Sequence, residues 1–241
     1  PDGTIAIKGI TFEAKHGESI AIVGENGAGK STLLLHLNGS LVSESGIVSI
    51  GNIPVTKKTL RIIRQNVGFL FQDPEDQLFM GKVFDDVAFG PLNLGLDSQE
   101  IEKRVNIALE QTGTKHLKNK MAHHLSIGEK KRIAIAAVLA MEPNIIAMDE
   151  PTSNLDPKSR EKLIRLLKGF THTKIIASHD YGMITEICPR TIVLFDGKIF
   201  ADGTTSQLLA DYELMRKCNL VPIKRYKCPK CNAEIMEHSN D

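Results

Sequence analysis

Short apolar runs recur along the first part of the chain, separated by turn-forming residues such as His16 and Gly17. Runs of this length with β-branched residues are typical of strands, so the first 72 residues are predicted to be mostly sheet. They begin with a small antiparallel β region at the N-terminus. The predicted strands cover residues 4–7, 9–12, 19–23, 47–50 and 66–71.

Between residues 73 and 142 the apolar positions take the 3.6-residue spacing of helices. Asp97 followed by Glu100 is a capping pattern before a predicted helix at 98–112. A run at 133–141 is apolar on nearly every face, which predicts a buried helix. We therefore expect a helical subdomain over about residues 73–142, inserted in the sheet domain.

Strands and helices alternate again in the C-terminal part of the chain. Asp156 followed by proline predicts a helix cap and a helix that reaches about residue 168. Residues 190–202 have the pattern of a hairpin with its turn at Asp196 and Gly197. Further strands are predicted at residues 144–148 and 174–177, so the fold class is α/β.

The strand predicted at 19–23 leads directly into GENGAGKST, residues 24–32. Its spacing is that of a P-loop, whose backbone N–H groups and following helix N-terminus bind phosphate. A lysine in this position adds a positive charge, and the serine hydroxyl can bind Mg²⁺. The pattern G-x-x-x-x-G-K-S is filled by Gly24, Gly29, Lys30 and Ser31.

Polar residues follow two of the other predicted strands. Asp149 and Glu150 end the strand at 144–148, and His179 comes just after the strand at 174–177. Because α/β sheets place their ligands at the carboxyl ends of strands, these side chains are candidates for chemistry.

Composition restricts the class of protein. The 241 residues are 41% hydrophobic and carry a net charge of +1, which gives no overall footprint for nucleic acid. The longest apolar run, at 133–141, is far shorter than the ~20 residues of a membrane span, so we expect a protein without one. Four cysteines, two of them in a C-x-x-C pattern, favour a reducing compartment over a disulfide framework.

Together these motifs resemble the nucleotide-binding subunit of an ABC transporter, over residues 1 to about 210. The Walker A motif is followed in order by the Q-loop glutamine Gln72, a Walker B motif that ends at Asp149 and Glu150, and the switch histidine His179. FQDPEDQLF and VAFGPLNLG look most like the ATPases of energy-coupling-factor importers, in particular the cobalt and nickel group. The resemblance implies a P-loop NTPase core of the ABC ATPase type, covering 1–210, with a C-terminal extension at 211–241.

The resemblance also implies roles for single residues. Glu150 would accept the proton of the attacking water, His179 would contact the γ-phosphate, and Gln72 would support the metal or the water. Mg²⁺ would be held by Ser31, Gln72 and Asp149. ATP would be bound by the loop residues Gly24, Glu25, Asn26, Gly27, Ala28, Gly29, Lys30, Ser31 and Thr32.

The signature motif of the family, LSGGQ, is LSIGE in this chain. In one interpretation Ser126 and Glu129 are simply a capping box. In the other, Ser126 and the backbone near Gly128 face the γ-phosphate held by a second subunit, and both can be true. Ile127 restricts the backbone and Glu129 adds negative charge, so turnover is expected to be slowed. Asp156, in the D-loop at 153–156, has two candidate roles, as a helix cap and in contacts between subunits.

The resemblance predicts an ATPase that powers a membrane importer for cobalt, nickel or a vitamin. It would act as a homodimer, or as a heterodimer with a second ABC ATPase, on the cytoplasmic face of the membrane. Its partners would be a transmembrane coupling protein and a substrate-binding membrane subunit, with no nucleic acid. One alternative is a soluble ABC ATPase, but residues 72 and 126 are 54 positions apart, which suits only a compact lobe. The other is a nucleotide-dependent regulatory or scaffold subunit with weak turnover.

The two ends of the chain carry separate expectations. An aromatic that stacks on adenine normally precedes a segment like PDGT, so it is expected to lie before Pro1. Near the other end, Cys228 and Cys231 are candidate Zn²⁺ ligands, and Cys218 and His238 together could complete a set of four. The alternative is a mobile tail with two free thiols.

Overall fold

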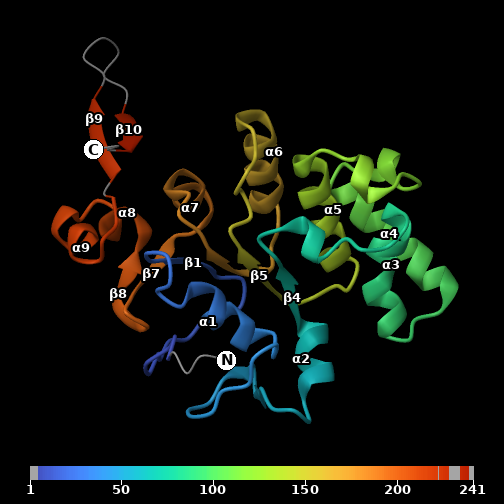
Figure 1. Ribbon diagram of the computed structural model, residues 1–241, viewed down its shortest axis with the longest axis horizontal. Helices are drawn as coiled ribbons and strands as arrows, with labels where there is room; N and C mark the ends of the chain where they lie inside the picture. Colours follow the sequence, from blue (N-terminus) through green and yellow to red (C-terminus); the bar gives the residue numbers. More distant parts are fainter. Residues whose placement is uncertain (1–4, 222, 228–233, 239–241) are drawn as a thin grey trace.

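A computed structural model describes residues 5–221, 223–227 and 234–238. Its centre is a six-stranded sheet with the strand order β4-β5-β6-β1-β7-β8 (Figure 1). All neighbouring strands are parallel except the last pair, β7 and β8. The strands are β1 (Ser19–Val23), β4 (Val67–Leu70), β5 (Ile145–Asp149), β6 (Thr173–Ala177), β7 (Arg190–Phe195) and β8 (Lys198–Thr204).

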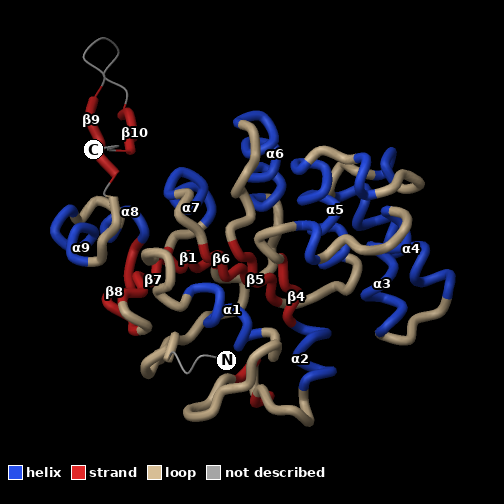
Figure 2. Tube along the Cα trace, in the orientation of Figure 1, coloured by secondary structure: helices blue, strands red, loops and turns tan. Residues whose placement is uncertain are grey.

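Helices cover both faces of this sheet (Figure 2). On one face, α1 (Lys30–Leu37) packs its leucines against Ile20 and Ile22 of β1 in one hydrophobic cluster. On the other face lie α5 (Ile127–Leu139), α6 (Pro157–Lys168) and α7 (Tyr181–Ile187). The parallel strands present their carboxyl ends along one edge of the sheet, where the P-loop, Asp149, Glu150 and His179 lie.

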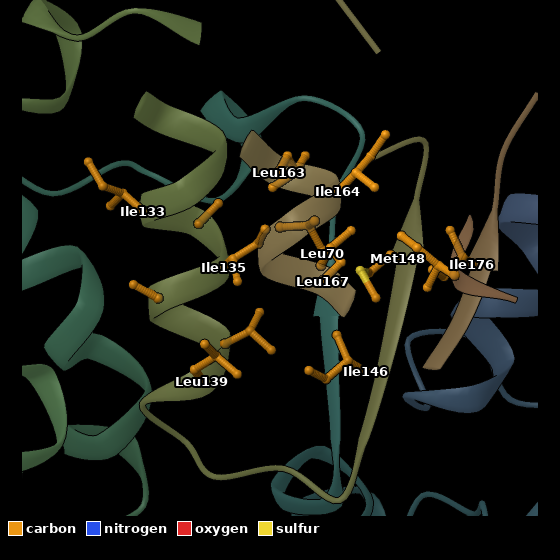
Figure 3. Close-up of a cluster of buried hydrophobic side chains, with 14 of the residues drawn as sticks. Leu70, Ile133, Ile135, Leu139, Ile146, Met148, Leu163, Ile164, Leu167 and Ile176 are labelled. Atoms are coloured by element: carbon orange, nitrogen blue, oxygen red, sulfur yellow. The ribbon is translucent and has the colours of Figure 1, made fainter. Parts of the chain in front are cut away.

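Three helices between β4 and β5 form the helical part of the chain: α3 (Val83–Asn93), α4 (Ser98–Gln111) and α5. A 3₁₀ turn at Pro74–Asp76 precedes α3, and two more, at Lys115–Leu117 and Ala122–His124, lie between α4 and α5. The core is continuous from these helices to the sheet. Figure 3 shows Ile135 and Leu139 of α5 beside Ile146 of β5 and Leu167 of α6.

The predicted helices and hairpin are confirmed. Asp97 caps α4, and Asp156 caps α6 by accepting from the backbone N–H groups of Lys158 and Ser159. β7 and β8 pair antiparallel across the turn at Asp196 and Gly197. These segments are right because their local signals, caps and turn residues agree with the packing.

The prediction for the N-terminal region is wrong in two respects. Residues 5–18 contain no strand, although Ile7, Ile10 and Phe12 pack against the core. The alternating apolar side chains are buried on one side of this segment, but its backbone does not form the ladder of hydrogen bonds that defines a strand. The first 72 residues are also not mostly sheet, because α2 (Leu60–Asn66) precedes β4. The run at 47–50 forms only β2 (Ser49–Ile50), which pairs antiparallel with β3 (Ile53–Pro54), and Ile47 is exposed.

Beyond β8 the chain forms α8 (Thr205–Leu208), α9 (Tyr212–Lys217) and a hairpin of β9 (Ile223–Lys227) and β10 (Glu234–His238). Met215 and Cys218 are fully buried in the main core cluster, so α9 packs on the sheet domain. Within the described ranges, no helix has the length and apolar character needed to cross a membrane.

Candidate functional site

The loop at 24–29 joins β1 to α1, at the centre of the sheet's carboxyl edge. Gly29 has φ 99°, and a Cβ on it would lie 2.5 Å from the Ala6 carbonyl oxygen, so only glycine fits. No side chain caps the N-terminus of α1 among the described residues. Its first N–H groups therefore remain available, and such a helix N-terminus fits a phosphate group.

The Lys30 side chain folds back over this loop. Its Nζ donates to the carbonyl oxygens of Gly24, at 2.8 Å, and Glu25, at 3.0 Å. Burial lowers the pKa of Lys30, while the nearby carboxylates of Glu150 and Asp149 raise it. The ammonium group thus lies next to the place where the loop would bind phosphate, held by neutral carbonyls.

Asp149, at the end of β5, lies beside the first turn of α1. Burial raises the pKa of its carboxyl group, and a hydrogen bond from the Ser31 hydroxyl opposes the shift. Ser31 itself is exposed, as is Gln72, which follows β4 next to β5 in the sheet. A carboxylate, a hydroxyl and an amide are all oxygen ligands of the kind that Mg²⁺ prefers, so these residues fit that ion.

Glu150 adopts a left-handed backbone conformation with φ 44°, rare for a residue with a side chain. It is 8% exposed, and its Oε2 accepts from the Ser178 hydroxyl at 2.9 Å. Its Oε1 lies 2.9 Å from Nδ1 of His179, whose side chain is 74% exposed. Glu150 follows β5, and Ser178 and His179 follow β6. Because β5 and β6 are neighbours in the sheet, Glu150 meets two residues that lie almost 30 positions later in the sequence.

The signature segment opens α5 in the helical part of the chain, away from the P-loop (Figure 1). The capping-box interpretation is confirmed. The Ser126 backbone N–H and hydroxyl both donate to Glu129 Oε2, at 2.9 and 2.8 Å, and the Glu129 N–H lies 3.3 Å from the Ser126 hydroxyl oxygen. These bonds from Ser126 lower the pKa of the Glu129 carboxyl group, so the segment carries a negative charge.

The next two positions of the signature segment, Ile127 and Gly128, differ in how closely they pack against the rest of the chain. Ile127 is 48% exposed, which leaves its side chain free of the core. A Cβ on Gly128 would lie 2.7 Å from the Ser159 hydroxyl oxygen, so this glycine allows α5 to approach α6 closely. Of the two candidate roles of Asp156, the structure contains the helix cap.

Sequence reasoning missed three parts of the site. Ser178 binds the Glu150 carboxylate, as described above. Arg160 forms two hydrogen bonds with the Asp180 carboxylate, at 2.6 and 2.5 Å, which ties α6 to the segment after β6. Lys131 is a buried lysine of α5 that donates to the backbone of Glu150. The position of Lys131 just before the apolar run at 133–141 could have indicated a buried lysine. The sequence pattern alone does not identify the groups that accept its hydrogen bonds.

The candidate zinc ligands in the tail lie largely outside the description. Cys228 and Cys231 are not among the described residues. Cys218 is 0% exposed in the core, and burial raises the pKa of its thiol, which disfavours the thiolate that binds metal. The described residues include no group of three or more histidine, cysteine or acidic side chains able to hold a metal.

Comparisons with known proteins agree with this geometry. The family model for ABC transporters matches residues 7–153. A protein of Geobacter sulfurreducens named as a candidate ABC transporter ATP-binding protein is 57% identical over 96% of this chain and 93% of its own. The energy-coupling factor transporter ATP-binding protein EcfA of Methanocaldococcus jannaschii is 48% identical over 91% of this chain and 81% of its own.

Two solved structures are similar as well. The first is cbiO1 of Clostridium perfringens, described as part of the ABC transporter complex cbiONQ, with a TM-score of 0.79 and 43% identity over 90% of this chain and 89% of that one. The second is the ATP-binding cassette MJ0796, a dimer bound to ADP and phosphate, with a TM-score of 0.75 and 30% identity over 83% and 90%. The chain belongs to the ABC transporter family, as an ATP-hydrolysing, ATP-binding subunit.

Proposed function

We propose that this subunit powers an importer of the energy-coupling-factor class, with a vitamin or a cobalt or nickel ion as cargo. The similarity to a protein named EcfA and to a member of the cbiONQ complex supports this class. The observation that carries the proposed chemistry is the meeting of Glu150, Ser178 and His179 beside the P-loop, at one edge of the sheet.

Binding of ATP would begin at the P-loop. The N–H groups at the uncapped N-terminus of α1 would donate to phosphate oxygens, and Lys30 would exchange its two backbone carbonyls for phosphate. Ser31, Asp149 and Gln72 would hold Mg²⁺, which neutralises charge on the phosphates. The Ser31 hydroxyl lowers the pKa of the Asp149 carboxyl group, so two of these groups already lie close to each other.

Glu150 would act as the general base. The Ser178 hydroxyl fixes one carboxylate oxygen, and His179 lies against the other. A proton from the attacking water would pass to this carboxylate as the water attacks the γ-phosphate. The exposed imidazole of His179 would contact the γ-phosphate, because its ring lies at the surface of the same edge.

A second ATPase subunit would complete the site. Ser126 and Gly128 lie on the helical part of the chain, whereas Lys30 lies at the centre of the sheet, so LSIGE would face the ATP of a partner subunit. The partner would be a second copy or a related ATPase, and Asp156 and its D-loop would contribute to the contact. The dimeric form of MJ0796 supports such an arrangement.

An exposed apolar patch supports docking to a membrane protein. Phe79 and Leu92 are each 61% exposed, and Phe89 lies edge-on to Phe79 with ring centroids 5.0 Å apart. The buried Asp86 carboxylate accepts from the backbone N–H groups of Phe79 and Met80, which fixes the loop that carries them. We assign this patch, close in sequence to Gln72, to a transmembrane coupling protein that works with a substrate-binding membrane subunit. The subunit would then be peripheral to the membrane, on its cytoplasmic face.

A regulatory or scaffold subunit with weak turnover is the second candidate function. It is favoured by the signature segment, where the Ser126 hydroxyl donates to the Glu129 carboxylate and a β-branched Ile127 replaces glycine. Phosphate release separates the two functions. Steady release above one phosphate per chain supports the motor, whereas bound ATP without further release supports the scaffold.

Copurification tests the membrane partner. The chain would be expressed with its membrane subunits, and Phe79→Ser would be compared with Phe200→Ser. Both phenylalanines are exposed and each lies edge-on to a second ring, but Phe200 lies on β8, away from the patch. We expect Phe79→Ser to reduce copurification at least tenfold and Phe200→Ser to leave it unchanged. Equal retention of both variants would contradict the assigned surface.

A further inference from the structure

Lys131 is among the largest fully buried side chains of the described protein, with 2% exposure. Burial of an ammonium group is unfavourable unless acceptors replace water. Lys131 has two of them: the Glu150 carbonyl oxygen at 3.0 Å and the Ser153 hydroxyl at 2.9 Å. Burial lowers the pKa of Lys131 to about 8, against the attraction of Glu150, Asp73 and Asp149. A lysine kept here in place of an apolar residue therefore indicates a specific role for these bonds.

Three donors meet at the carbonyl oxygen of Glu150. Besides Lys131, the hydroxyl of Ser153 donates to it at 2.9 Å and the backbone N–H of Ser153 at 3.1 Å. Glu150 is also the residue with the left-handed backbone conformation. The hydrogen bonds to its carbonyl thus hold the conformation in which its carboxylate reaches Ser178 and His179.

The helix that carries Lys131 is shared between two parts of the molecule. α5 packs against α3 and α4, and also against β4 and α6 of the sheet domain. Ser126, at its start, lies five residues before Lys131, about 7.5 Å along the helix axis. One rigid element therefore carries the signature residues at its end and a contact to Glu150 little more than one turn later.

We propose that Lys131 is a positioning residue for ATP hydrolysis, which holds the Glu150 backbone from the signature helix and so ties LSIGE to the base of its own chain. The inference rests on the proposed role of Glu150 and on the proposed dimer. In that dimer LSIGE contacts the ATP of the partner, while Lys131 acts on the ATP of its own chain. A shift of α5 on binding the partner's nucleotide would reach Glu150 through this contact.

The first test separates positioning from binding. Lys131→Met keeps an unbranched side chain that is one atom shorter but removes the donor, and we expect kcat to fall at least tenfold with ATP affinity within twofold of wild type. Lys130→Met is the matched control, because Lys130 is adjacent in α5 but binds Glu75 at the surface, at 2.5 Å. An unchanged kcat in Lys131→Met would overturn the inference, as would a parallel loss of ATP affinity.

Two further variants keep the test valid if Lys131→Met folds poorly. Lys131→Gln retains a donor and should lose less activity than Lys131→Met, at a melting temperature near that of wild type. Ser153→Ala removes the other side chain at the same carbonyl, so its effect on kcat should be less than additive with that of Lys131→Met. Fully additive effects would contradict a shared action on Glu150.

Mixed dimers test which site Lys131 serves. In the first dimer, one chain carries Lys131→Met and the other Glu150→Gln, so the only base belongs to the chain without Lys131. In the second, one chain carries both changes and its partner is wild type, so the only base has its own Lys131. We expect the first to be at least tenfold slower, and equal or reversed rates would overturn the inference.

The Glu150→Gln homodimer separates this inference from the function on which it rests. If Glu150→Gln retains the wild-type kcat, the assignment of the base is wrong and the inference falls with it. If Glu150→Gln is inactive but Lys131→Met has normal kcat, only the inference about Lys131 is overturned.

Discussion

The two ends of the proposed ATP site are built differently. At the Glu150 end, a nearly buried carboxylate is held by Ser178 and His179, and its backbone is held by Lys131 and Ser153. At the LSIGE end, Ser126 is exposed and forms its hydrogen bonds with Glu129 of the same turn. The Glu150 end is organised by contacts within a single chain. At the LSIGE end the hydrogen bonds are local to one turn, and we propose that contacts with a partner subunit replace them.

This difference predicts which changes matter most. Substitutions at the held end should change the chemical step and leave ATP binding intact. Substitutions at the open end should change assembly of the dimer first, and turnover as a consequence.

The largest effect is expected from Glu150→Gln, which removes the base but keeps the shape of the side chain. General-base catalysis contributes typically ~10²–10⁴-fold, so we expect kcat to fall by about that factor. Equilibrium binding of a fluorescent ATP analogue should be unchanged, with Lys30→Ala as the control that loses binding. A fall in kcat of less than tenfold would show that another group accepts the proton.

Ser126→Ala should have the next largest effect, at the open end. It removes the hydroxyl proposed to face the partner's ATP and also costs about 1 kcal/mol as a lost helix cap. We expect at least a tenfold loss of ATP-dependent dimer formation, measured by sedimentation, with ATP affinity of the single chain unchanged. Glu129→Ala disrupts the same capping box without removing the hydroxyl. If both variants dimerise equally poorly, the cap alone explains the effect.

Ile127→Gly should have a smaller effect of opposite sign. Glycine relieves the restricted backbone beside the proposed γ-phosphate contact, at a cost of about 0.5–1 kcal/mol in local helix stability. We expect turnover or ATP-driven dimerisation to increase by a few fold, measured by phosphate release and sedimentation. Lower activity at an unchanged melting temperature would mean that Ile127 makes a favourable contact, and that its departure from glycine does not slow the enzyme.

The smallest effect on turnover is expected from the tail, which belongs to neither end of the site. We predict that Cys228 and Cys231 bind Zn²⁺ or a similar ion, because C-P-K-C has the ligand spacing of half a zinc site and several lysines lie close to it in the sequence. Elemental analysis should find the metal in the wild type and lose it in Cys228→Ser/Cys231→Ser, with kcat unchanged. Less than about a tenth of an equivalent in freshly purified, chelator-free wild type, with none taken up on titration, would leave two ordinary thiols.

At the Glu150 end of the site, the sequence predicted the residues of the known motifs but not the contacts that hold them. Asp149, Glu150 and His179 could be proposed from the sequence, because Asp149 ends one strand, Glu150 follows it, His179 comes shortly after another strand, and all three match a motif in order. Ser178 and Lys131 could not, because their partners depend on β5, β6 and α5 lying side by side, which no local pattern specifies. The prediction of strands at 5–18 failed for a related reason. Alternating apolar residues indicate which side chains are buried, but a strand also needs a neighbouring strand to pair with its backbone.

We propose that LSIGE of one chain completes the ATP site at the P-loop of the other chain. This proposal is tested most directly by sedimentation of Glu150→Gln with saturating ATP and Mg²⁺, since this variant should bind ATP but not hydrolyse it. We expect a stable dimer that dissociates when ADP replaces ATP. This dimer should not form when Ser126→Ala is added to Glu150→Gln. A Glu150→Gln protein that remains monomeric with ATP bound would contradict it.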